Sequence, residues 1–90
     1  MSATLIVRHP VNDYDTWLAA YESVFPLHKQ YGVTSSQVLH APGDTTDITV
    51  IHNFTTLEDA QGLASDPALK AAMERGGVSG APRIEIVVGA

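Results

Sequence analysis

The chain has no cysteine, few basic residues and no long apolar run, and each absence narrows its possible functions. Without cysteine there can be no disulfide, no thiol nucleophile and no thiolate-type zinc site. Only five basic residues stand against ten acidic ones, so nucleic acid and anionic membrane surfaces are unfavourable partners. No apolar run approaches the ~20 residues that span a bilayer, and a signal-peptide pattern is missing. We therefore expect a cytoplasmic protein that binds neither nucleic acid nor membrane.

The length of 90 residues and the 44% hydrophobic content predict one globular domain, 1–90. A domain of this size buries only roughly 60 to 65% of the surface that its unfolded chain exposes. Its stability is then small, and association with a second copy would add buried surface.

Two hydrophobic periods alternate along the chain. Period two with β-branched residues is typical of strands and occurs at 3–9, 33–40, 48–54 and 83–88. Period 3.6 beside capping residues is typical of helices and occurs within 11–31, 57–64 and 68–75. Pro26 should break the first helix after Phe25 and let its last turn swing away from the sheet, near His28. Asp66 and Pro67 should restart the second helical region.

The turn-rich segment 41–47 predicts a hairpin between the second and third strands. A turn centred near Gly43 and Asp44 sets the register of the two strands. The predicted opposed pairs are Val38 with Val50, His40 with Ile48, Ser36 with His52, and Thr34 with Phe54.

The element order β-α-β-β-α-β predicts a ferredoxin-like α+β fold. In this fold an antiparallel four-stranded sheet of order 4-1-3-2 carries its helices on one face. The other face keeps apolar side chains that water would contact, so we expect two sheets to pack face to face in a homodimer. The expected interface residues are Leu39, Ile51 and Val87, with either Ile6 or the Leu5 and Val7 pair.

Three segments carry a resemblance to a known group of proteins: VRHPVNDYDTW, IHNFTTLEDA and SDPALKAAMERGGVSGAPRIEIV. Through them nearly the whole chain resembles the dimeric α/β-barrel superfamily, including antibiotic-biosynthesis-monooxygenase-like proteins and a small bacterial group labelled cyclase or uncharacterised. The resemblance implies the fold and a range of activities, from cofactor-free oxygenation to haem cleavage. Haem cleavage is disfavoured because the only tryptophan is Trp17, in the first helix. Gly62 and Leu63 replace a bulkier pair, which predicts space beneath the second helix.

The histidines are the chemical candidates. His9 and His52 lie on strands that should face the helices, where each is either a proton acceptor or a hydrogen-bonded core residue. His28 and His40 are expected at the rim or surface. The topology allows two pairs, His9 with His40 and His28 with His52. Neither pair has a local metal-ligand spacing, so we predict no metal site.

Aromatic residues at helical spacing line one side of the first helix and are either core or the wall of a pocket. Both interpretations can hold together. The residues are Tyr14, Trp17, Tyr21 and Phe25. We expect His9, His52 and Tyr14 to be catalytic, and the ligand to contact Trp17, Tyr21, Phe25, His28 and Met73.

Two functions remain open. The first is an enzyme that needs no cofactor: a His or Tyr removes a proton from a small aromatic or polyketide-like molecule, which then reacts with dioxygen or closes a ring. The second is a non-catalytic homodimer that binds a small ligand or serves as a structural subunit. The enzyme hypothesis requires His9, His52, Tyr14 or Tyr21 to reach an open cavity.

Overall fold

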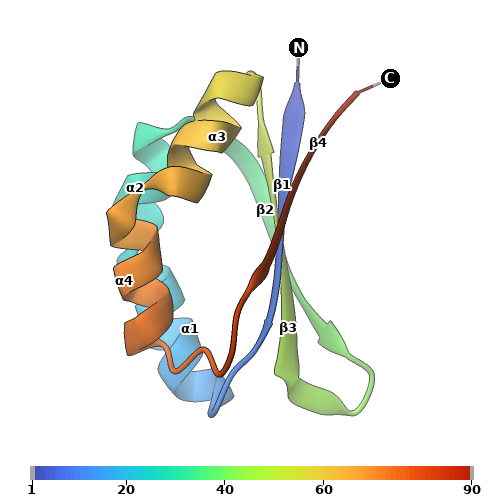
Figure 1. Cartoon of the computed structure of the whole chain (residues 1–90), viewed down its shortest axis with the longest axis vertical. Coiled ribbons are helices and arrows are strands. Elements are labelled where there is room, and N and C mark those ends of the chain that lie inside the picture. Colours follow the sequence, from blue (N-terminus) through green and yellow to red (C-terminus); the bar gives the residue numbers. More distant parts are fainter. Residues whose placement is uncertain (1, 90) are drawn as a thin grey trace.

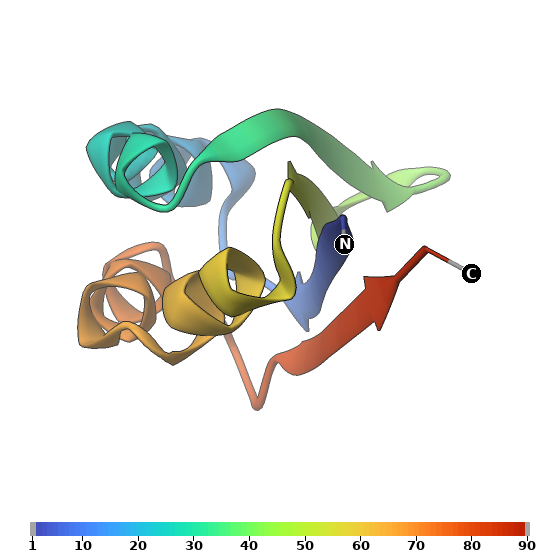
Figure 2. The same cartoon turned by 90° about the horizontal axis from the view of Figure 1, so that it is seen from above.

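The computed structural model describes residues 2–89, which form a four-stranded antiparallel sheet with four helices on one face (Figure 1). The strand order β2-β3-β1-β4 is the predicted order 4-1-3-2. The strands are β1 (Ala3–Pro10), β2 (Val33–Ala41), β3 (Asp44–Phe54) and β4 (Arg83–Val88). The helices are α1 (Tyr14–Ser23), α2 (Phe25–Gln30), α3 (Leu57–Ser65) and α4 (Pro67–Arg75). The α1–α2 and α3–α4 pairs lie side by side along the sheet (Figure 2).

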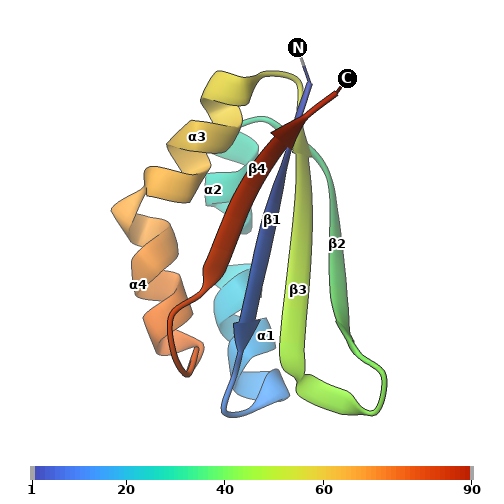
Figure 3. The same cartoon turned by 45° about the vertical axis from the view of Figure 1, so that its right-hand side comes forward.

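The two central strands, β1 and β3, carry the inner wall of the core (Figure 3). Successive side chains of a strand point to opposite faces, so every second residue is buried against the helices. The buried members are Ala3, Leu5, Val7 and His9 on β1, and Ile48, Val50, His52 and Phe54 on β3. A histidine therefore ends the buried row of β1, and another interrupts that of β3.

The hairpin register is confirmed for three of the four predicted pairs and is wrong for Thr34 with Phe54. Val33 lies opposite Phe54 instead, because a bulge between Val33 and Ser35 shifts the pairing. A bulge adds one residue to one strand, which a count along the sequence cannot detect.

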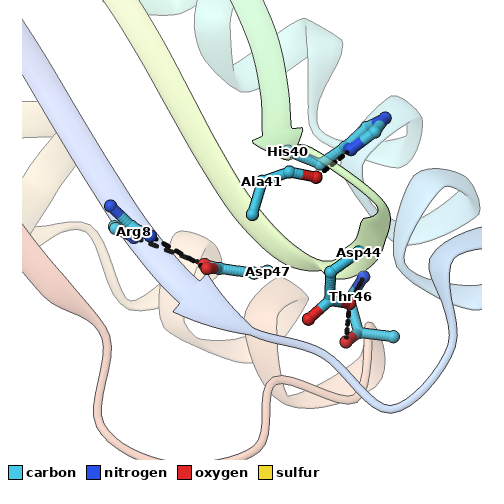
Figure 4. A network of polar contacts seen from close by, with 6 residues as sticks. All are labelled: Arg8, His40, Ala41, Asp44, Thr46 and Asp47. Atoms are coloured by element: carbon cyan, nitrogen blue, oxygen red, sulfur yellow. Dashed lines mark hydrogen bonds and ion pairs between the residues drawn. The ribbon is translucent and has the colours of Figure 1, made fainter.

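The hairpin turn is tighter than expected, since Ala41 pairs with Asp44 and only Pro42 and Gly43 lie between them. Gly43 has a φ of 76°, a conformation that glycine adopts without steric cost. The Asp44 carboxylate accepts hydrogen bonds from the amide and the hydroxyl of Thr46 (Figure 4). This turn lets β3 begin at Asp44 rather than at residue 48.

The first helical segment is broken one residue earlier than predicted, at Val24. Asp13 caps α1 by accepting a hydrogen bond from the Thr16 amide. Pro26 lies in the first turn of α2, where its missing N–H leaves no hydrogen bond unmade. The predicted swing away from the sheet is wrong: α2 returns toward the core and buries His28.

The expected space beneath the second helical region is filled by the ring of Tyr31. A methyl group at Gly62 would lie 2.7 Å from Cε1 of Tyr31. The Tyr31 hydroxyl donates to Oδ2 of Asp66 at 2.6 Å, and Asp66 caps α4 through the Ala68 amide. Gly62 therefore makes room for a side chain that comes from the other helix pair.

The outer face of the sheet combines apolar and polar side chains. Ile6 points outward, whereas Leu5 and Val7 are buried, which settles the alternative left by the sequence. Leu39 and Val87 are exposed large hydrophobic residues. Two ion pairs flank this apolar area, Arg8 with Asp47 (Figure 4) and Arg83 with Glu85. No helix within residues 2–89 is long and apolar enough to cross a membrane.

Candidate functional site

A cavity of about 40 Å³ lies between the helices and the inner face of the sheet. A water molecule needs roughly 10–15 Å³ of such space, so the cavity holds only a few small molecules. Most of its wall is apolar, and three histidines interrupt it. The lining residues are Leu5, Val7, His9, Trp17, Tyr21, Val24, His28, Val50, His52, Leu69, Ala72 and Met73.

A continuous row of rings forms one side of the cavity. The Trp17 ring lies between His9, at a centroid distance of 6.0 Å, and Tyr21, which stacks on it at 5.0 Å. The Tyr21 ring in turn stacks on His52 at 6.1 Å. His28 and His52 have the shortest separation, 4.5 Å between ring centroids. Helix α1 supplies Trp17 and Tyr21 from successive turns, so the period of 3.6 accounts for their alignment.

The histidines keep hydrogen-bonding capacity that the described part of the chain does not use. His52 Nδ1 lies 2.7 Å from the Ser36 hydroxyl, which comes from the neighbouring strand β2. Nδ1 of His9 and Nε2 of His28 are buried, and neither has a hydrogen-bond partner within residues 2–89. Buried polar atoms normally have a partner, so these two nitrogens mark sites where a bound molecule would be stabilised.

Burial keeps the three imidazoles neutral. It lowers the pKa of His9 and His28, and it lowers the pKa of His52 to about 4, with a smaller contribution from the nearby His28. A neutral imidazole has one nitrogen that can accept a proton. Burial also raises the pKa of Tyr21, which the Ser36 hydroxyl partly offsets. At neutral pH the cavity thus contains uncharged proton acceptors and a protonated phenol.

A wider groove of about 550 Å³ opens beside the cavity, between the α1–α2 pair and the edge strand β2. Tyr21 and His28 line both spaces, so they form the boundary between cavity and groove. The groove is large enough for a polycyclic ligand, whereas the cavity is not. The groove residues are Tyr21, Phe25, His28, Lys29, Val33, Ser35, Ser36 and Val38.

Six residues predicted as catalytic or ligand-binding line the cavity: His9, Trp17, Tyr21, His28, His52 and Met73. Phe25 lines the groove but not the cavity, and half of its surface is exposed. Tyr14 lies outside the cavity lining and packs beside Trp17 at 6.1 Å. His28 was expected at the rim or surface; the surface position is wrong, because His28 is only 7% exposed, although it lies where the cavity meets the groove.

Of the two predicted histidine pairs, the structure brings together His28 and His52. His40 is exposed on β2, where its Nδ1 lies 2.8 Å from the Ala41 carbonyl (Figure 4), while His9 is buried in the core. Ser36 was not among the predicted site residues, although the hairpin register already placed it opposite His52. Within residues 2–89, no three His, Asp or Glu side chains converge as metal ligands would.

No protein-family model matches the chain, and no curated protein does. Solved structures do match. SnoaB, a cofactor-independent oxygenase from Streptomyces nogalater, aligns with a TM-score of 0.79 at 10% identity, over 99% of this chain and 93% of its own. A candidate antibiotic biosynthesis monooxygenase from Caulobacter crescentus aligns with a TM-score of 0.77 at 14% identity, over 99% and 90%. A candidate antibiotic biosynthesis monooxygenase from Bordetella bronchiseptica aligns with a TM-score of 0.79 at 9% identity, over 99% of this chain and 97% of its own. The predicted fold is thereby confirmed, and at these identities the likeness concerns the fold.

Proposed function

We propose that the chain is a cofactor-free enzyme that oxygenates a small aromatic or polyketide-like molecule. The observation that carries the proposal is the pairing of two neutral imidazoles: His28 lies at the boundary between a small cavity and a groove of ligand size, and His52 beside it lines the cavity. The aromatic substrate lies in the groove, and the cavity admits dioxygen beside the two imidazoles. The likeness in fold to a cofactor-independent oxygenase supports the same reaction class.

The reaction begins with proton transfer from an enolisable carbon of the substrate to an imidazole of the His28–His52 pair. The imidazolium then stabilises the carbanion that it has generated, because the two charges lie in a site with little water. The carbanion gives one electron to dioxygen, and the two radicals combine into a peroxide on that carbon. The imidazolium returns its proton to the peroxide, and loss of water from this hydroperoxide removes the remaining hydrogen of the carbon, breaks the O–O bond and leaves a carbonyl. In net terms a CH₂ group and O₂ become C=O and H₂O.

The roles differ among the site residues. His28 is the better-placed proton acceptor, because its Nε2 has no partner within the described residues. His52 is oriented by the Ser36 hydroxyl. The short distance between the His28 and His52 rings limits this pair to one added proton at a time, because two positive charges would repel each other. Tyr21 remains protonated and can donate a hydrogen bond to the substrate oxygen.

Oxygen consumption with anthrone as probe tests the proposal. Anthrone has a CH₂ group between two rings and is converted by O₂ into anthraquinone and water. We expect a rate above that of the buffer, with the quinone formed in equal amount to the oxygen consumed. His28→Asn and His52→Asn should each reduce this rate by about 10²-fold or more, as loss of a general base does.

The matched control is His40→Asn, which changes an exposed histidine on β2 and should leave the rate unaltered. Treatment with a metal chelator should also leave it unaltered, because the proposed reaction uses no metal. Wild-type protein that does not exceed the buffer rate with anthrone or with related hydroxylated anthrones would count against an oxygenase.

The second candidate is a non-catalytic protein that binds a small ligand. A specific observation favours it: with a pKa of about 4, His52 is a weak base in the free protein. Oxygen consumption with anthrone, measured together with calorimetric binding of an aromatic probe, distinguishes the oxygenase from the binding protein. Binding of an aromatic probe without oxygen consumption supports the binding protein.

We further propose that two copies associate through the outer face of the sheet. Leu39 and Val87 expose 39% and 47% of their surfaces there, beside the outward-facing Ile6 and Ile51. Burial of this apolar area would stabilise a small domain. Light scattering should give twice the chain mass, and Val87→Asp should lower that mass to one chain, whereas Lys70→Asp on α4 should not. A monomeric wild-type mass at micromolar concentration would rule the association out.

A further inference from the structure

The groove beside the cavity has an aromatic wall that no part of the described chain covers. Phe25 exposes 50% of its surface and meets Tyr21 edge to face at 5.4 Å between ring centroids. Val33 and Val38 of the edge strand β2 form the opposite side. A planar ring that entered here would cover apolar surface on both sides, which water otherwise contacts.

The charge of the groove is opposite to that of the chain. The protein has a formal charge of −5, and yet, among the described residues that line the groove, Lys29 is the one with a fully charged side chain. No carboxylate within residues 2–89 forms an ion pair with Lys29, whereas Arg8 and Arg83 each pair with an acidic neighbour. The positive charge of Lys29 is thus available to a ligand.

His28, which lines both the groove and the cavity, adds an independent indication. His28 is 7% exposed, and its Nε2 has no hydrogen-bond partner among the described residues. A ligand that reached the boundary between groove and cavity could supply that partner. The hydrogen bond would offset a cost of burial that the free protein bears.

We propose that the groove binds planar aromatic anions, with an acidic group of the ligand at Lys29 and its ring against Phe25 and Tyr21. A carboxylate or an ionised phenol satisfies this requirement, and the far edge of the ring system then points toward His28. The inference rests on the proposed function, since it names the substrate class of the same site. It adds that a neutral aromatic of the same shape binds more weakly.

Calorimetric titration with 2-naphthoate and 2-naphthamide tests the charge requirement, because the two probes have nearly the same shape and differ in charge. The wild-type protein should bind the naphthoate about five-fold more tightly, the size of an exposed ion pair. Lys29→Gln should remove that preference by weakening the naphthoate alone. Phe25→Ala should weaken both probes to a similar extent, because it removes the aromatic surface that they share.

The matched control is Lys70→Gln, which removes a lysine that lines a different groove, between α4 and β4. It should leave both titrations unchanged. Equal affinity of the two probes, or no binding of either, would overturn the proposal, and so would an effect of Lys29→Gln on both probes alike. These outcomes are independent of oxygen consumption from anthrone, which is neutral and depends on His28 and His52.

Discussion

Acid should destabilise the protein in the pH range where its buried histidines titrate. His52 has a pKa of about 4 in the folded state, compared with 6.5 when unperturbed. The folded state therefore excludes a proton that the unfolded state binds. The free energy of unfolding is highest above pH 6.5 and decreases as the pH falls from 6.5 toward 4.

The size of the effect follows from the shift. A pKa difference of one unit between the folded and unfolded states corresponds to about 1.4 kcal/mol, so His52 accounts for a loss of about 3 kcal/mol in the free energy of unfolding over this range. Burial lowers the pKa of His9 and His28 too, and their contributions have the same sign. Burial-independent losses from Asp13, Asp44 and Asp66 have the same sign, because hydrogen bonds hold their pKa values in the folded state below the ordinary 3.8, but these losses begin only as the pH approaches 3.8. The free energy of unfolding of a small domain is only about 5 to 15 kcal/mol, so a loss of this size is easily measured.

Urea denaturation followed by circular dichroism at pH 7.5, 6.5, 5.5 and 4.5 measures this dependence. The comparison is with His52→Asn, which keeps a polar group near the Ser36 hydroxyl but does not titrate. This variant should be less stable at pH 7.5 and should lose less stability as the pH falls. His40→Asn, at an exposed position, should follow the wild-type curve. Parallel curves for the wild type and His52→Asn would refute the assignment of a buried, neutral His52.

The packing of the helices leads to further predictions, all measured by the midpoint of thermal unfolding. Gly62→Ala should destabilise the fold by about 1 to 3 kcal/mol, because the new methyl group would lie 2.7 Å from the Tyr31 ring. The same substitution in a Tyr31→Ala background should instead stabilise α3, since alanine is then free to act as the better helix former. Leu63→Ala removes a side chain with no exposed surface and should cost about 2 to 5 kcal/mol. Asp66→Ala should lower the midpoint because it deletes both the cap of α4 and the acceptor for Tyr31, and Asp66→Asn should lower it less.

Much of the fold could be predicted because local features specify it. Asp13, Thr56 and Asp66 accept hydrogen bonds from helix amides a few residues away, and such capping is visible as a short motif. The alternating burial in β1 and β3 is also a local feature, because successive side chains of a strand point to opposite faces of the sheet. The alternation left open which face of the sheet Ile6 occupies, and this depends on how β1 pairs between β3 and β4.

The candidate site could be predicted only in part. Trp17 and Tyr21 share one side of α1, so the helical period places them together. His28 was misplaced because its burial depends on where the helix breaks and on how α2 then returns toward the sheet. Tyr14 obeys the same period as Trp17 but lies one turn too early to reach the cavity.

The sequence by itself determined the element order, the strand order and the side of α1 that faces the core, since these depend on period, caps and connection rules. Tertiary structure alone decided that His28 meets His52, that Tyr31 occupies the space beside Gly62, and that a groove with one lysine lies next to the cavity. These features depend on contacts between segments far apart in the chain. Such contacts are set by how side chains fill the space between the helices and the sheet, and no local pattern specifies that packing.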